Sequence, residues 1–202
     1  MKKNRIDEMS FLDHLEELRW HLIRCVLAIL LCGGIAFLSK DFIFNEILFG
    51  PRNTDFFTYD LLCKLSNTIG LDDSFCINEM PFRIQSRTMS GQFSAHIWMS
   101  ITFGFIISFP YIIYQFWSFI SPGLYQNEKK SARGFITISS ILFFIGVLFG
   151  YYIVTPLSIN FLGSYSVSED IFNDFDLDSY VGLVRSAVVA SGLIFELPII
   201  VY

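Results

Sequence analysis

The chain has 202 residues, of which 53% are hydrophobic and 17% aromatic, and its formal net charge is −5 at pH 7. An apolar fraction this large exceeds what ordinary soluble domains of this length carry. The apolar stretches are hydrophobic all round rather than on one face, which argues against a soluble helical protein built from amphipathic stripes. The composition therefore predicts an integral membrane protein.

Residues 10–24 predict an amphipathic helix that runs into the first apolar stretch. Phe11, Leu15, Leu18 and Leu22 recur at helical spacing on one face of this segment. A long polar segment precedes the apolar stretch and no small-residue cleavage site follows it. The stretch is therefore expected to stay in the mature protein rather than act as a cleaved secretory signal.

Four stretches are long and apolar enough to cross a bilayer, which needs about 20 mainly apolar residues per helix. These stretches are residues 22–39, 97–120, 134–155 and 181–202. They predict an all-α integral membrane protein, a transmembrane helix bundle that forms one domain over residues 1–202. Pro110 and Pro198 lie within the second and fourth spans, where a missing backbone donor predicts kinked helices.

The placement of lysine and arginine predicts the orientation of the spans. Basic residues precede the first span and recur in the loop 121–133, whereas the loop 156–180 has none. The N-terminus and the loop 121–133 are therefore expected inside, and the loops 40–96 and 156–180 outside. The loop 40–96 also carries basic residues, but a loop this long follows the charge rule poorly.

The four cysteines divide according to this topology. Cys25 and Cys32 fall within the first span, whereas Cys63 and Cys76 share the first outer loop. Only the second pair could readily oxidise, and a disulfide closing this loop would stabilise the fold by about 3 kcal/mol. Two free thiols remain an open alternative.

No catalytic constellation is visible in the sequence. The three histidines and four cysteines show no metal-ligand spacing, no serine lies in a nucleophile motif, and no phosphate-binding loop is present. The sequence therefore predicts neither an enzyme, nor a metal site, nor a cofactor.

Glu196 is an ionisable residue in the fourth span, where a charge exposed to lipid costs on the order of 3 kcal/mol. Arg185 lies eleven residues earlier on the same helix. That spacing separates the two by roughly 16 Å, so they cannot form a direct ion pair. Glu196 is expected to face a polar helix or a substrate, or else to be a protonated structural acid.

Glu17 and Glu128 are brought to the same inner surface by the predicted topology. A partner with two adjacent arginines would suit two carboxylates, because a planar guanidinium can fork onto each and a lysine cannot. Spacing alone favours two solvated glutamates, because an exposed glutamate in a helix is usually only solvated.

Three segments resemble the TatC family, the membrane subunit of the twin-arginine, Sec-independent protein translocase. They are FLDHLEELRWHLIR, YIIYQFWSFISPGLYQNEKK and SGLIFELPII, of which the stretch FWSFISPGLYQNEKK is the most specific. The resemblance covers nearly the whole chain and implies a cupped bundle of kinked helices. The family has six spans with both termini inside, and this chain carries four, so we expect it to be truncated at its C-terminal side.

The resemblance implies a receptor for the twin-arginine signal peptides of folded precursor proteins. It also implies the core scaffold of an oligomeric translocase in the cytoplasmic (inner) membrane of a bacterium, with a cytoplasmic N-terminus. Single-span TatA/TatB-type subunits are the implied protein partners, the lipid bilayer is the surroundings, and no nucleic acid is involved.

The family's functional residues carry over by position. The implied signal-peptide site consists of Glu17, Leu18, Arg19, Phe119 and Glu128. Glu196 and Gln115 are the implied intramembrane polar residues that meet partners. Pro51 is the implied structural proline of the first outer loop, and Pro110 and Pro198 are the structural prolines that the sequence itself places within the spans.

Two alternatives remain open at this point. A small-solute or ion transporter would use Glu196 and Arg185 as a coupled charge pair, and internal repeats would favour it. The two halves of the chain show no such similarity. A passive membrane assembly protein would instead bind partners without needing Glu17 or Glu128.

Overall fold

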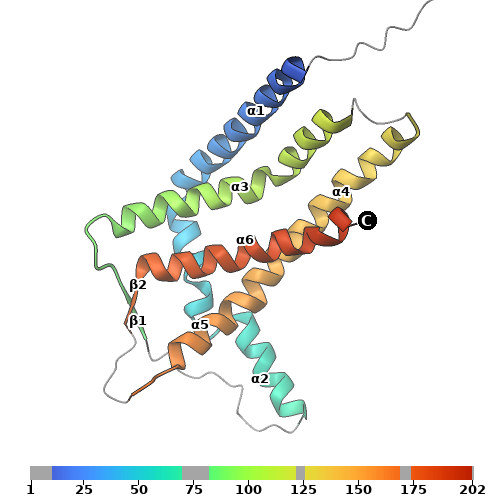
Figure 1. The fold of residues 1–202 in the computed structure, drawn as a ribbon. Coiled ribbons are helices and arrows are strands. Elements are labelled where there is room, and N and C mark those ends of the chain that lie inside the picture. The colour runs from blue at the N-terminus through green and yellow to red at the C-terminus, as the bar shows by residue number, and fades with distance from the viewer. Residues whose placement is uncertain (1–10, 70–81, 122–125, 169–173, 202) are drawn as a thin grey trace, which may run out of the picture.

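The computed structural model describes residues 11–69, 82–121, 126–168 and 174–201, and these form a bundle of long helices (Figure 1). The four longest helices are α1 (Phe11–Leu38), α3 (Gly91–Ile120), α4 (Gln126–Phe149) and α6 (Leu177–Val201). Two shorter helices are α2 (Phe57–Ile69) and α5 (Thr155–Ser164). The helical fold class predicted from the sequence is confirmed.

Four helical segments of the described chain are long and apolar enough to cross a membrane. They are His14–Leu38, Gly91–Ile120, Gly134–Ser164 and Leu177–Ile199. The first starts earlier than residue 22 because the amphipathic helix and the first span are one continuous helix, α1. Most of the predicted loop 121–133 is helical, because α4 already begins at Gln126.

The third span also extends past its predicted end at residue 155. A π-helical turn, Gly150–Val154, joins α4 to α5, and Pro156 lies in the first turn of α5. A proline is tolerated there because a first-turn residue needs no backbone donor. The side chain of Thr155 donates a hydrogen bond to the carbonyl of Gly150 at 2.8 Å, which satisfies an acceptor in the widened turn.

The helices pack as two pairs joined through α3. α1 packs chiefly against α3 and α4 against α6, while α3 also contacts α4 and α6. Figure 1 shows that the start of α1, the end of α3 and the start of α4 lie at one end of the molecule. We call this the N-terminal end of the bundle. α3 contains Pro110 and bends toward this end.

Glycines bring the helix backbones close at both pair contacts. A Cβ added to Gly104 of α3 would lie 2.5 Å from the carbonyl oxygen of Ile29 and 2.7 Å from the nitrogen of Gly33, both in α1. A Cβ on Gly146 or Gly150 would lie 2.7 or 2.8 Å from a backbone oxygen of α6. Close approach at small residues is how membrane helices maximise packing, so these glycines set both crossings.

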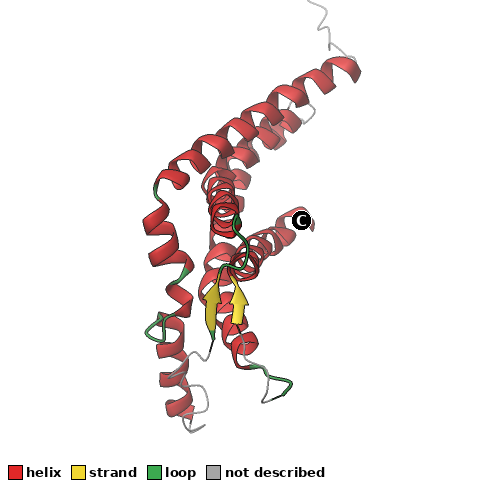
Figure 2. Ribbon diagram, turned by 90° about the vertical axis from the view of Figure 1, so that its left-hand side faces the viewer, coloured by secondary structure: helices red, strands yellow, loops and turns green. Residues whose placement is uncertain are grey.

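At the opposite end of the bundle, a short parallel sheet joins the segment before α3 to the segment before α6. β1 (Arg83–Gln85) pairs with β2 (Asp174–Asp176), as Figure 2 shows in yellow. The backbone N–H of Arg87 donates to Oδ1 of Asp176 at 3.0 Å, and the Arg87 guanidinium donates to the carbonyl of Asp174 at 3.0 Å. The sequence analysis predicted only outer loops, 40–96 and 156–180, for these two segments.

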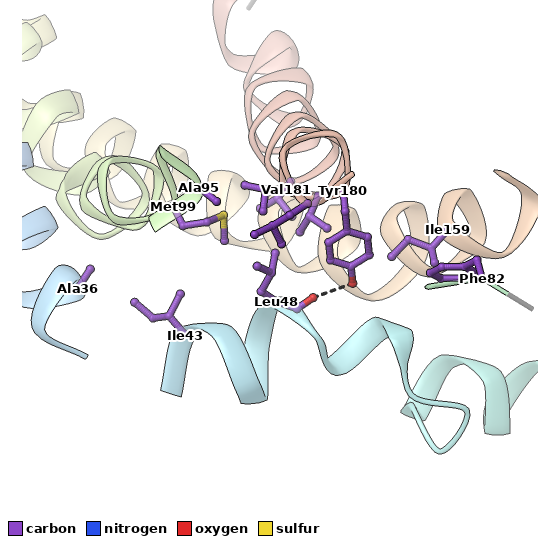
Figure 3. Close-up of a cluster of buried hydrophobic side chains, with 12 residues drawn as sticks. Ala36, Ile43, Leu48, Phe82, Ala95, Met99, Ile159, Tyr180 and Val181 are labelled. Carbon is purple, nitrogen blue, oxygen red and sulfur yellow. Dashed lines mark hydrogen bonds between the residues drawn. The ribbon is translucent and has the colours of Figure 1, made fainter. Parts of the chain in front are cut away.

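The main buried cluster lies near this sheet, where a π-helical turn (Phe42–Leu48) meets α3 and α6. Leu48 is fully buried, and Met99 and Val181 pack in the same cluster (Figure 3). The hydroxyl of Tyr180 donates to the carbonyl of Leu48 at 2.8 Å, a bond drawn in Figure 3. A carbonyl of the irregular turn therefore has a partner inside an apolar core.

Pro51 is a buried residue of the 3-10 turn Gly50–Arg52. The hydroxyl of Tyr59 lies 2.8 Å from the Pro51 carbonyl and 3.2 Å from that of Pro156, and it donates to these two acceptors. Burial raises the pKa of Tyr59, which lies outside the spans, so its hydroxyl keeps the proton that it donates. Pro51 is thus anchored to the start of α5.

Three of the four cysteines lie among the described residues. Cys25 and Cys32 are free thiols, and Cys63 is disulfide-bonded. Cys76 lies outside the described residues, so its pairing with Cys63 stays a prediction.

Candidate functional site

Aromatic contacts hold the N-terminal part of α1 against the end of α3. The rings of His14 and Phe119 stack with centroids 4.3 Å apart and an interplanar angle of 22°. His21, two helical turns after His14, meets the same ring edge-on at 6.0 Å. These contacts bring the segment around Glu17 and Leu18 next to the last turn of α3.

A chain of polar side chains reinforces this contact. Nδ1 of His21 donates to Oε1 of Gln115 at 2.6 Å, and Nε2 of Gln115 donates to the hydroxyl of Tyr111 at 2.6 Å. Gln115 is 5% exposed, and both ends of its amide have a partner. A buried amide whose oxygen accepts from α1 and whose nitrogen donates within α3 links these two helices.

The other residues of the site that the family resemblance implies lie at the same end of the bundle. Glu17 and Leu18 are half-buried and Arg19 is exposed. Leu18 and Phe119 line a small hollow between α1 and α3. The side chain of Glu128 lies outside the described residues, although its position falls in the first turn of α4.

The start of α4 is held near this hollow through a second ring contact. Trp117 of α3 and Phe135 of α4 have ring centroids 5.0 Å apart. The last turns of α3 therefore contact α1 on one side and α4 on the other. Residues around position 17 and residues around position 128 belong to one end of the molecule, as Figure 1 also shows.

Glu196 is buried between α6 and α4, with 7% of its surface exposed. The hydroxyl of Ser139 donates to its Oε2 atom. The other oxygen, Oε1, is a buried acceptor without a hydrogen-bond partner among the described residues. Glu196 therefore contacts a polar side chain of α4, and one of its two oxygens has no hydrogen-bond donor among the described residues.

The structure does not join Gln115 to Glu196. Gln115 bonds to His21 and Tyr111 between α1 and α3, whereas Glu196 bonds to Ser139 between α4 and α6. The two intramembrane polar residues that the sequence grouped thus belong to two separate helix contacts.

Arg185 finds an aromatic partner in α3. Its guanidinium carbon lies 4.8 Å from the centroid of the Trp98 ring. A cation over an indole face is attracted to the ring quadrupole, so this contact shelters a charge inside a span. The sequence did not predict this partner, because Trp98 and Arg185 are far apart in the chain.

Four polar residues of these contacts were missed from the sequence, namely His14, His21, Tyr111 and Ser139. His14 and His21 lie seven positions apart, which places them on one face of a helix, and that spacing was the available signal. Nothing in the sequence pairs Ser139 with Glu196. Within the described part of the chain, no group of three or more His, Cys, Asp and Glu residues could hold a metal ion.

Helices that cross a membrane, a polar and aromatic site at one end and a buried carboxylate between two spans together define a multi-pass membrane protein. The family model described as "Sec-independent protein translocase protein (TatC)" matches residues 13–202. The chain belongs to the TatC family.

Curated relatives and a solved structure agree with this assignment. The chain is 42% identical over 201 residues to the TatC protein of Blattabacterium sp. subsp. Periplaneta americana, covering 99% of this chain and 76% of that protein. It is 35% identical to the TatC protein of Aquifex aeolicus, covering 96% of this chain and 71% of that protein.

A crystal structure titled as the twin arginine translocase receptor TatC matches with a TM-score of 0.71 and 33% identity, covering 94% of this chain and 73% of that one. Since the relatives are bacterial translocase proteins, the chain is a multi-pass protein of the inner membrane. The comparisons do not support the alternative of a small-solute or ion transporter.

Proposed function

We propose that this chain is the twin-arginine signal-peptide receptor and the core scaffold of a translocase that moves folded proteins across the bacterial inner membrane. The observation that carries the proposal is the meeting of the first turns of α1, the last turn of α3 and the start of α4 at one end of the bundle. Phe119 stacks on His14 of α1, and Trp117, two residues earlier on α3, contacts Phe135 of α4.

Two carboxylates and an aromatic ring suit the chemistry of an arginine pair. Each guanidinium presents a planar set of donors that can fork onto a carboxylate, and its flat face can stack on a ring. Glu17 and Glu128 supply the carboxylates in this proposal, Phe119 supplies the ring, and Leu18 supplies apolar contact beside them. Arg19, exposed on α1, completes the proposed site.

The N-terminal end of the bundle is cytoplasmic in this proposal, since the signal peptide arrives from the cytoplasm. A membrane-impermeant thiol reagent added to intact cells should modify Met89→Cys, which replaces a fully exposed side chain at the opposite end. It should not modify Leu15→Cys on α1. Modification of Leu15→Cys but not of Met89→Cys would show that the bundle has the opposite orientation.

Photo-crosslinking tests the binding site itself. A photoreactive amino acid at Leu18 should capture a twin-arginine peptide, and the matched twin-lysine peptide should be captured far less. The control is the same amino acid at Leu38, an exposed apolar position at the other end of α1. Equal capture of both peptides at position 18 would contradict the proposal that the site recognises guanidinium groups.

Glu196 is proposed as the contact for a single-span TatA/TatB-type subunit of an oligomeric complex. Its open oxygen, Oε1, supports a donor arriving from another helix, because an unpaired buried acceptor is costly. Co-purification of such a subunit should fall with Glu196→Ala and persist with Glu17→Gln.

A passive assembly protein would instead keep its signal-peptide binding in both Glu17→Gln and Glu128→Gln.

A further inference from the structure

Phe119 contacts two histidines of α1. His14 covers one region of the ring in a near-parallel stack at 4.3 Å, and His21 meets it edge-on at 6.0 Å with an interplanar angle of 64°. Stacked and edge-on contacts are the two preferred arrangements of aromatic rings. Two such contacts from one helix restrict both the tilt and the position of the Phe119 ring.

His21 is itself fixed by the hydrogen bonds to Gln115 and onward to Tyr111. Gln115 and Phe119 are four residues apart on α3, so they lie one above the other on the same helix face. These hydrogen bonds therefore link the face of α3 that carries Phe119 to His21, the ring that contacts Phe119 edge-on.

We propose that His14 and His21 are positioning residues of the signal-peptide site, and that they set its preference for arginine over lysine by fixing the plane of the Phe119 ring. This proposal rests on the proposed function. The two histidines need not touch the peptide, because they act through Phe119.

The physical reason lies in the difference between the two cations. A guanidinium is planar and gains from a flat stack on an aromatic face, whereas an ammonium is a compact charge with little orientational demand. A ring that tilts freely loses more of its attraction for arginine than for lysine. Release of Phe119 should therefore reduce discrimination more than it reduces overall peptide binding.

Peptide binding to the full chain in lipid nanodiscs tests the proposal. The measurement is the ratio of Kd values for twin-arginine and twin-lysine peptides. His14→Ala and His21→Leu should each lower that preference by about fivefold to tenfold, while His14→Tyr, which retains a ring, should keep it.

His96 offers a matched control at the opposite end of the bundle. It stacks on Phe37 at 4.0 Å in the same manner as His14 stacks on Phe119. His96→Ala removes a comparable contact and should leave the arginine preference unchanged. If a general loss of helix packing were the cause, the arginine preference would change in His14→Ala, His21→Leu and His96→Ala alike.

The ¹⁹F spectrum of 4-fluorophenylalanine at position 119 reports the ring directly. One sharp resonance is expected in the wild-type background, a shifted or broadened one in His14→Ala and His21→Leu, and recovery in His14→Tyr. A wild-type chain without arginine preference would overturn both the proposed function and this proposal. A preference that survives in His14→Ala and His21→Leu would overturn the positioning role alone.

Discussion

Gly104 is the residue on which the contact between α1 and α3 depends most closely. In Gly104→Ala the new Cβ would lie 2.5 Å from the carbonyl oxygen of Ile29, whereas ordinary contacts begin at 3.4 Å. The two helices must separate locally by about 0.9 Å, the difference between these distances. The obstacles are backbone atoms, which cannot rotate away, so overpacking should destabilise the fold by about 1–3 kcal/mol.

The neighbouring glycines of α1 supply a graded comparison. A Cβ on Gly33 would meet the carbonyl oxygen of Ser100 at 3.2 Å, and a Cβ on Gly34 would meet nothing within 4 Å. Thermal unfolding in detergent micelles should therefore rank Gly104→Ala as least stable, Gly33→Ala next, and Gly34→Ala equal to or above wild type, since alanine favours helix. Equal unfolding temperatures for Gly104→Ala and Gly34→Ala would refute this account of the crossing.

The same unfolding assay checks further contacts. Ser139→Ala leaves the carboxylate of Glu196 without its described donor and should destabilise the fold by about 1–3 kcal/mol, whereas Ser140→Ala, which loses only a bond to its own helix, should change it little. Tyr59→Phe leaves two carbonyls without their hydroxyl donor and should cost about 1–2 kcal/mol. Because burial raises the Tyr59 pKa, its contribution should persist below about pH 10 and decline at higher pH. Mass spectrometry of non-reduced peptides should join Cys63 to Cys76, and finding either as a free thiol would contradict that pairing.

The spans and the helical fold class followed from the sequence because lipid imposes a length and a composition on each helix. Helix ends were harder to place. The third span is predicted to end at residue 155, yet the helical segment continues through α5 to Ser164, because Pro156 lies in the first turn of α5, where a proline is tolerated. The strands β1 and β2 were missed, since each has three residues and its partner lies 91 positions away.

For the candidate site, residue types were easier to predict than contacts. Phe119 and Gln115 were selected through the family resemblance, but only the folded chain brings His14 and His21 onto them. Glu196 was selected as a costly charge, yet its partner, Ser139, is one of several serines in α4 with nothing local to distinguish it. Long-range partners of this kind depend on helix register and crossing, which periodicity does not specify.

A double-mutant cycle between the chain and its peptide tests the central claim, that paired carboxylates at the N-terminal end of the bundle bind paired arginines. Peptides with arginine or lysine at each of the two positions are titrated against wild type, Glu17→Gln and Glu128→Gln. A lysine substitution should weaken binding to wild type at least tenfold and should weaken it clearly less once the matching glutamate is neutralised, a coupling of about 1.5–3 kcal/mol. Additive effects in every combination would contradict it, because the carboxylates and the guanidinium groups would then act independently.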